Sequence, residues 1–156
     1  MWLTRKIATY RSFSPLERRV VRKAATLLAV TPAGLRVLGM TRWHARLDHW
    51  ATRLGHNVRL DPDQSVAADR TARLVAAAAR NVWPQATCLH RSMVLMSLLR
   101  AQRVEGVIRY GVRRRKGQFE AHAWVENHGR PITEPGDPYG DYAALHNYGM
   151  ETSRGL

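Results

Sequence analysis

Residues 118–126 read QFEAHAWVE, and this stretch decides the fold. Every second residue in it is apolar, which is the pattern of a β-strand with one buried face. The apolar face carries Phe119, Ala121, Ala123 and Val125. The opposite face carries Glu120, His122, Trp124 and Glu126. The segment therefore predicts a strand that presents a histidine from its middle.

Two further strands are predicted, one on each side of this segment in the chain. Residues 107–112 read VIRYGV and residues 130–134 read RPITE. A basic turn over 113–117 joins the first of them to the central strand, and the turn 127–129 joins the central strand to the last. Short turns between consecutive strands imply antiparallel pairing.

The first half of the chain has the apolar spacing of helices. Ser14 and Glu17 form a capping box, with Pro15 at the first helical position. We expect this helix to end at Thr31–Pro32 and a short helix to follow it as far as Leu38, with Gly39 as its stop. Further helices are expected over 41–54 and 65–83.

A last helix is expected to begin at Cys88, with Thr87 as its N-cap. It would bury a broad apolar surface between residues 89 and 99. Helices followed by an antiparallel sheet predict an α+β fold.

Cys88 is the only cysteine of the chain, and its predicted place is chemically suggestive. Unpaired backbone N–H groups and the helix dipole stabilise a thiolate at a helix start. His122 follows on a strand, and the acids Glu134 and Asp137 follow on the next strand and its turn. This order of thiol, imidazole and carboxylate is that of papain-type catalysis. The competing interpretation of a lone cysteine in an apolar helix is a small buried hydrophobe.

The segment from Ala72 to Ile132 resembles the transglutaminase-like peptidase of lasso-peptide biosynthesis. The resemblance is carried by Thr87-Cys88-Leu89 and by residues 119–126, FEAHAWVE. It implies a cysteine protease that removes the leader peptide from a ribosomally made precursor. It also implies a separate protein that captures the leader, and a macrolactam cyclase as a further partner.

Residue by residue, the resemblance makes Cys88 the nucleophile and His122 the base. The acid of the family lies about twelve residues beyond the histidine and is usually Asp, whereas this chain has Glu134 there. Asp137 remains the alternative acid. We expect a helical region over 1–60, a transglutaminase-like peptidase core over 61–150 with its antiparallel sheet packed on the cysteine-bearing helix, and a flexible tail over 151–156.

The chain carries 25 Lys and Arg against 12 Asp and Glu, a formal charge of +13. Such a charge favours acidic partners, anionic lipid or nucleic acid. We expect neither nucleic acid nor membrane as partner, because we find no nucleic-acid-binding motif and no apolar stretch approaching ~20 residues. A lone thiol fits the cytoplasm. We expect no cofactor and no metal, since His44 and His49 suit one helical face poorly.

Two rival functions stay open at this stage. The same Cys-His-acid set would serve a transglutaminase or a deamidase, because only the acyl acceptor differs. The other rival is a basic nucleic-acid-binding module with an inert cysteine.

Overall fold

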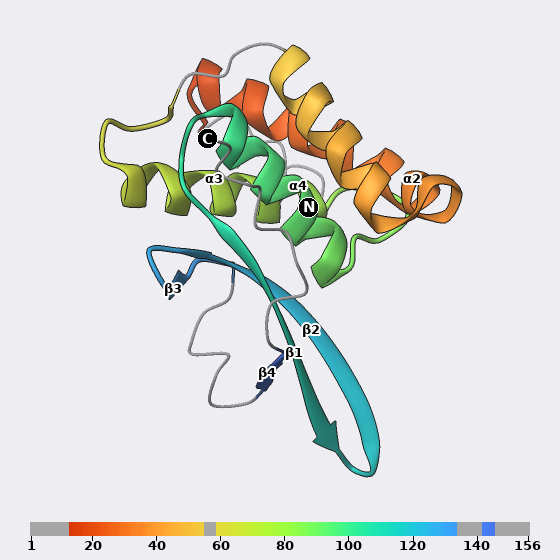
Figure 1. The fold of residues 1–156 in the computed structure, drawn as a ribbon. Helices are drawn as coiled ribbons and strands as arrows, with labels where there is room; N and C mark the ends of the chain where they lie inside the picture. Colours follow the sequence, from red (N-terminus) through yellow and green to blue (C-terminus); the bar gives the residue numbers. More distant parts are fainter. Residues whose placement is uncertain (1–12, 55–58, 134–141, 146–156) are drawn as a thin grey trace, which may run out of the picture.

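The computed structural model describes residues 13–54, 59–133 and 142–145. Within them the chain forms three helices, followed by a sheet (Figure 1). The helices are α2 (Pro15–Arg53), α3 (Gln64–Ala79) and α4 (Cys88–Ala101). The strands are β1 (Val107–Arg115), β2 (Gln118–Asn127), β3 (Arg130–Pro131) and β4 (Ala143–Leu145). The sheet is antiparallel with strand order β3-β2-β1-β4, so the predicted α+β fold is confirmed.

Helix α2 begins as predicted but does not end at Pro32. The Ser14 hydroxyl accepts the N–H of Glu17, and the Glu17 carboxylate accepts the N–H of Ser14, which completes the capping box. Pro32 lies inside the helix, so the expected end at Thr31–Pro32 is wrong. A proline φ fits a helix, and its cost there is one lost N–H donor and local crowding, which packing can offset. Thr31 shows that packing, because it is fully buried.

The break in α2 comes at Gly39, where the backbone is non-helical with φ 71° and ψ 174°. Figure 1 shows the chain turning back there, so that α2 forms two arms. The arms close on each other at Gly34, where an added Cβ would lie 2.2 Å from the indole ring of Trp43. Glycine is required at this contact because no side chain would fit.

The three helices share one apolar core. Its fully buried members come from both arms of α2, from α3 and from α4. They include Leu27, Leu28, Leu47, Val75, Val94, Leu95 and Leu99. The sheet adds Val125 to this cluster, and Ala123 is buried beside it. The apolar face predicted for the central strand is therefore buried only in its inner half, because Phe119 and Ala121 are exposed where the hairpin extends away from the helices.

Strands β1 and β2 form a long hairpin that extends away from the helices (Figure 1). Their pairing runs from Val107 opposite Glu126 to Arg115 opposite Gln118. Lys116 and Gly117 both have positive φ, 48° and 82°, as a tight two-residue hairpin turn requires. Strand β1 is therefore longer than predicted, because residues 113–115 extend the strand instead of forming the turn.

Helix α2 is also long and apolar enough to cross a membrane, judged by length and composition alone. Of its most apolar window, 28% is buried within the fold. The sequence-based expectation that no such stretch exists is neither confirmed nor contradicted by this result, because core helices of soluble proteins can have the same length and composition. The break at Gly39 lies within this helix, so its two arms are separate helical pieces.

Candidate active site

Cys88 is the first residue of α4, and the helix start is capped on its backbone. The Thr87 hydroxyl accepts the N–H of His90 at 3.4 Å, and Nδ1 of His90 accepts the N–H of Thr87 at 3.3 Å. Burial lowers the pKa of His90, which keeps Nδ1 free to accept. Cys88 is partly buried at this helix start.

Helix α4 runs alongside β2 in the same direction. Near its start, the Ser92 hydroxyl donates to the carbonyl of Ala123 at 3.1 Å. Beyond its end, the Asn127 amide donates to the carbonyl of Glu105 at 2.8 Å. Cys88 precedes Ser92 by one helical turn on the same face. Cys88 therefore lies toward the part of β2 that precedes Ala123, and it lines a pocket together with Ala123.

The start of α4 lies at the edge of β2 that faces β3. Val125 bonds on that side, because its carbonyl accepts from Ile132 and its N–H donates to the Thr133 hydroxyl. Residues two apart in a strand direct their backbone groups to the same side, so the carbonyl of Ala123 also points to this edge. Ser92 reaches it there. A group at the edge of a strand has access to both of its faces.

A pocket opens at Cys88 between the helices and the sheet. Most of its wall is apolar, and Arg91 and Thr133 add polar groups. The lining residues are Ala72, Val75, Ala76, Cys88, Arg91, Ser92, Leu95, Ala123 and Thr133. Cys88 thus shares the pocket with Ala123, the residue after His122, and with Thr133, the residue before Glu134. Glu134 and Asp137 themselves lie outside the described residues.

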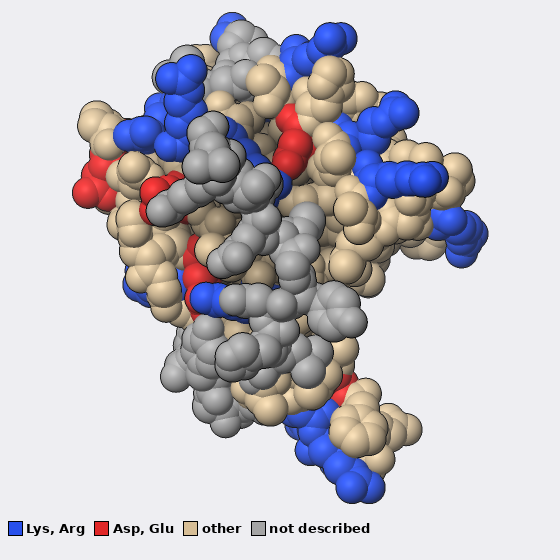
Figure 2. All heavy atoms as spheres, viewed as in Figure 1, with Lys and Arg blue, Asp and Glu red and all other residues tan. Residues whose placement is uncertain are grey.

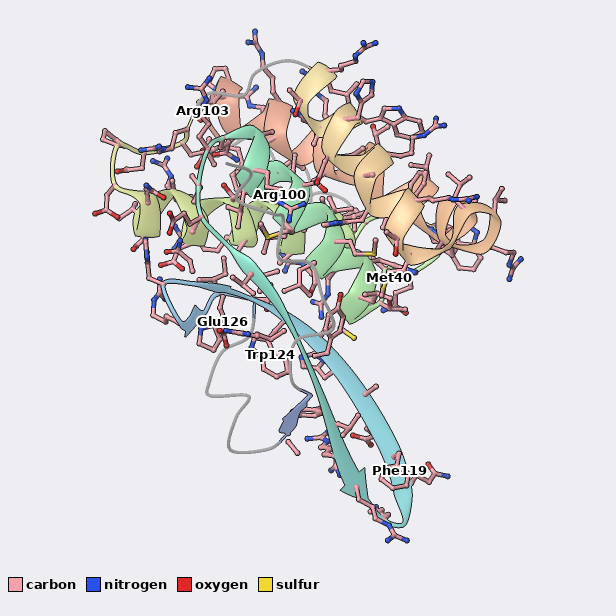
Figure 3. All side chains as sticks on the ribbon, in the orientation of Figure 1. Met40, Arg100, Arg103, Phe119, Trp124 and Glu126 are labelled. Carbon is pink, nitrogen blue, oxygen red and sulfur yellow. The ribbon has the colours of Figure 1, made fainter. Side chains whose placement is uncertain are left out.

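The imidazole of His122 belongs to an aromatic stack. Its ring centroid lies 5.1 Å from that of Tyr142 and 6.1 Å from that of Trp124, with interplanar angles of 26° and 23°. Figure 3 shows Trp124 on the side of β2 turned away from the helices. Alternation places His122 on that same side, whereas Ala123 lines the Cys88 pocket. The Cys88 thiol and the His122 imidazole therefore lie toward opposite faces of β2, and a contact between them has to pass the edge of this strand.

A buried polar network supports this stack, and the sequence did not reveal it. The indole N–H of fully buried Trp124 donates to Glu126 at 3.0 Å, and Arg109 Nε donates to the other oxygen of Glu126 at 3.1 Å. Glu126 is 3% exposed. The network fixes the indole on which the His122 ring lies.

Gly111, opposite His122 in the register, leaves the space that the stack needs. An added Cβ there would lie 2.8 Å from the Cβ of Tyr142 and 2.9 Å from the Trp124 ring. A glycine inside a strand often marks such a close approach, and this signal was available in the sequence. The stacking of Tyr142 on His122 could not be predicted from the sequence, because Tyr142 lies far from His122 along the chain.

These features define an α+β protein with a capped-helix thiol beside a histidine-bearing strand, the arrangement of cysteine-dependent acyl chemistry. The chain belongs to the transglutaminase-like superfamily, whose family model matches residues 15–147. Members of this superfamily are typically cysteine-dependent enzymes of peptidase or acyl-transferase type. No curated protein and no solved structure matches the chain.

Proposed function

We propose that this protein is a cysteine peptidase that removes the leader peptide from a lasso-peptide precursor. The observation that carries the proposal is Cys88, the first residue of a capped helix whose Ser92 bonds to β2 at Ala123, the residue after His122. The superfamily match supports cysteine-dependent chemistry. The similarity of residues 119–126 to the lasso-peptide peptidases supports the finer assignment.

In the proposed reaction His122 accepts the thiol proton and the Cys88 thiolate attacks the scissile carbonyl carbon. The peptide C–N bond breaks, the leaving amine takes the proton from the imidazolium, and a thioester remains. Water then loses a proton to His122 and attacks the thioester, which releases the acid and restores the thiol. The Cys88 N–H at the helix start is suited to stabilise the oxyanion.

Glu134 is our proposed orienting acid for His122, and Asp137 is the alternative. Thr133, the residue before Glu134 in the sequence, lines the pocket together with Cys88. We expect Glu134→Gln to reduce kcat strongly while Cys88 still reacts with iodoacetamide. A large loss of kcat in Asp137→Asn alone would transfer the role to Asp137.

The proposal includes a leader-recognition protein and the precursor peptide as partners, with the macrolactam cyclase as a further partner and the cytoplasm as the location. The test is to incubate the chain with a candidate precursor, with and without the recognition protein, and to measure product masses. Two fragments that together contain one added water indicate hydrolysis. One chain with an amide converted to an acid would indicate a deamidase instead.

The matched variants are Cys88→Ala, His122→Ala and His128→Ala. His128 is an exposed histidine on the turn after β2, so its loss controls for a general effect of removing imidazole. We expect the first two variants to lose cleavage by about 10³-fold or more and the third to keep it. Normal cleavage by Cys88→Ala would refute the mechanism.

A further inference from the structure

One side of the β1–β2 hairpin runs from the Cys88 pocket to the hairpin tip. In the register Tyr110 lies opposite Ala123, Val112 opposite Ala121, and Arg114 opposite Phe119. Side chains of such pairs share a face, and every second pair lies on the same one. We call the surface made by these six residues the hairpin face. It begins at Ala123, which lines the Cys88 pocket, and ends at Phe119.

The far end of the hairpin face has an exposed aromatic side chain. Phe119 is 78% exposed, and Figure 3 shows it at the outer end of the hairpin. The guanidinium carbon of Arg114 lies 5.8 Å from its ring centroid. Between Phe119 and the pocket, Ala121 is small and exposed, Val112 and Tyr110 are half-buried, and Ala123 is buried at the pocket. Phe119 lies four positions from Ala123 along the strand, a span of about 13 Å.

The tip is also strongly basic. Arg114, Arg115 and Lys116 are exposed, and Figure 2 shows their positive charge gathered at the projecting end of the molecule. Glu120, the acid of the outer hairpin, is engaged by Arg113, whose Nε donates to it at 2.6 Å. The tip therefore carries three cations that no acid of the hairpin's outer half neutralises.

We propose that the hairpin face binds an acidic, extended segment of the polypeptide substrate, with an apolar side chain against Phe119. The proposal rests on the proposed function, because it places the scissile bond at Cys88. An extended chain that leaves the pocket along this face reaches the basic tip after about four to six residues. A peptide fits these observations better than nucleic acid, because the basic and aromatic groups lie at the end of a track from the thiol.

The test measures binding apart from catalysis, in the inactive Cys88→Ala chain. The probe is a labelled, glutamate-rich peptide with one leucine, followed by fluorescence anisotropy. Two triple charge reversals are compared: Arg114, Arg115 and Lys116 to Glu on the hairpin, and Arg42, Arg46 and Arg53 to Glu on α2. All six residues are exposed, and both triples change the net charge equally. We expect the hairpin triple to raise the Kd about tenfold or more and the α2 triple about twofold at most.

A second matched pair tests the apolar contact. Phe119→Ser is compared with Val37→Ser, because the two side chains are 78% and 79% exposed. Only Phe119→Ser should weaken the binding of the leucine-containing peptide, and replacing leucine by serine in the peptide should remove the difference.

Two results would overturn the proposal. Equal weakening by both charge reversals would mean that the overall field, not the hairpin, attracts the peptide. Tighter hairpin-dependent binding of a single-stranded oligonucleotide or of a phosphatidylserine vesicle would assign the tip to another class of partner. The proposed function is tested by a separate measurement, the cleavage of a candidate precursor by the unmodified chain, and absence of cleavage there would refute that function alone.

Discussion

The helical layer and the outer half of the β1–β2 hairpin differ in where their side chains lie. In α4 every residue from 92 to 99 is buried, whereas in the hairpin every residue from 114 to 119 is exposed. Apolar burial supplies most of the free energy of folding. Stability is therefore concentrated in the helices, while the hairpin tip is free to carry charge and an exposed aromatic ring for recognition.

The largest expected effect contrasts one core residue with one tip residue. Leu47 is fully buried between the helices, so Leu47→Ala should lower the free energy of unfolding by about 2–5 kcal/mol. Phe119→Ala removes a larger side chain from an exposed place and should change it by less than about 0.5 kcal/mol. Urea denaturation of both variants checks this. Similar losses in the two would mean that the hairpin tip contributes to the core.

A second contrast lies within the hairpin, between its base and its tip. Arg109→Ala removes a donor to Glu126 and leaves that buried carboxylate poorly compensated, at a cost of about 1–3 kcal/mol. Arg114→Ala at the exposed tip should cost almost nothing. The double variant Arg109→Ala with Glu126→Gln should recover part of the loss in the same denaturation experiment. Equal stability of the Arg109→Ala and Arg114→Ala proteins would show that the base is as tolerant as the tip.

Local signals in the sequence predicted the elements well. The capping groups at Ser14 and Thr87 act on neighbouring residues, and both helices begin where these residues predict. The alternation over 118–126 likewise depends on adjacent side chains. Pro32 misled the prediction because the tertiary packing of α2 outweighs the local preference of proline. The extension of β1 through Arg115 depends on pairing with β2, which local composition does not determine.

The candidate site was predicted less completely than the fold. Cys88 could be placed at a helix start and His122 on a strand, and the structure puts them there. Alternation placed the His122 ring on the face of Trp124, but its other stacking partner, Tyr142, directly precedes β4 and comes from far along the chain. The sequence had no signal for this long-range contact. The roles of Cys88, His122 and Glu134 stay predictions, and Glu134 lies outside the described residues.

The smallest expected effect concerns pH and contrasts a buried histidine with an exposed one. His44 in α2 is 2% exposed, and burial lowers its pKa from the ordinary value of 6.5; Asp48 opposes this shift and Arg100 adds to it. The unfolded chain therefore takes up a proton at a higher pH than the folded chain does. Stability should be full above about pH 6.5 and decline as the pH falls from there toward the lower pKa of the folded state, below which both states bind the proton and the decline stops.

Unfolding free energies measured on both sides of pH 6.5 would check this sign. His90, whose pKa is lowered in the same direction, contributes to the same decline, so the variant comparison is needed to isolate His44. His44→Leu should lose less stability on acidification than the unmodified protein does, because the buried imidazole is gone. His49→Leu, an exposed histidine on the same helix, is the matched control and should keep the original pH dependence. If His44→Leu keeps the full decline, the acid sensitivity of the fold comes from groups other than His44, among which His90 in α4 would be tested next.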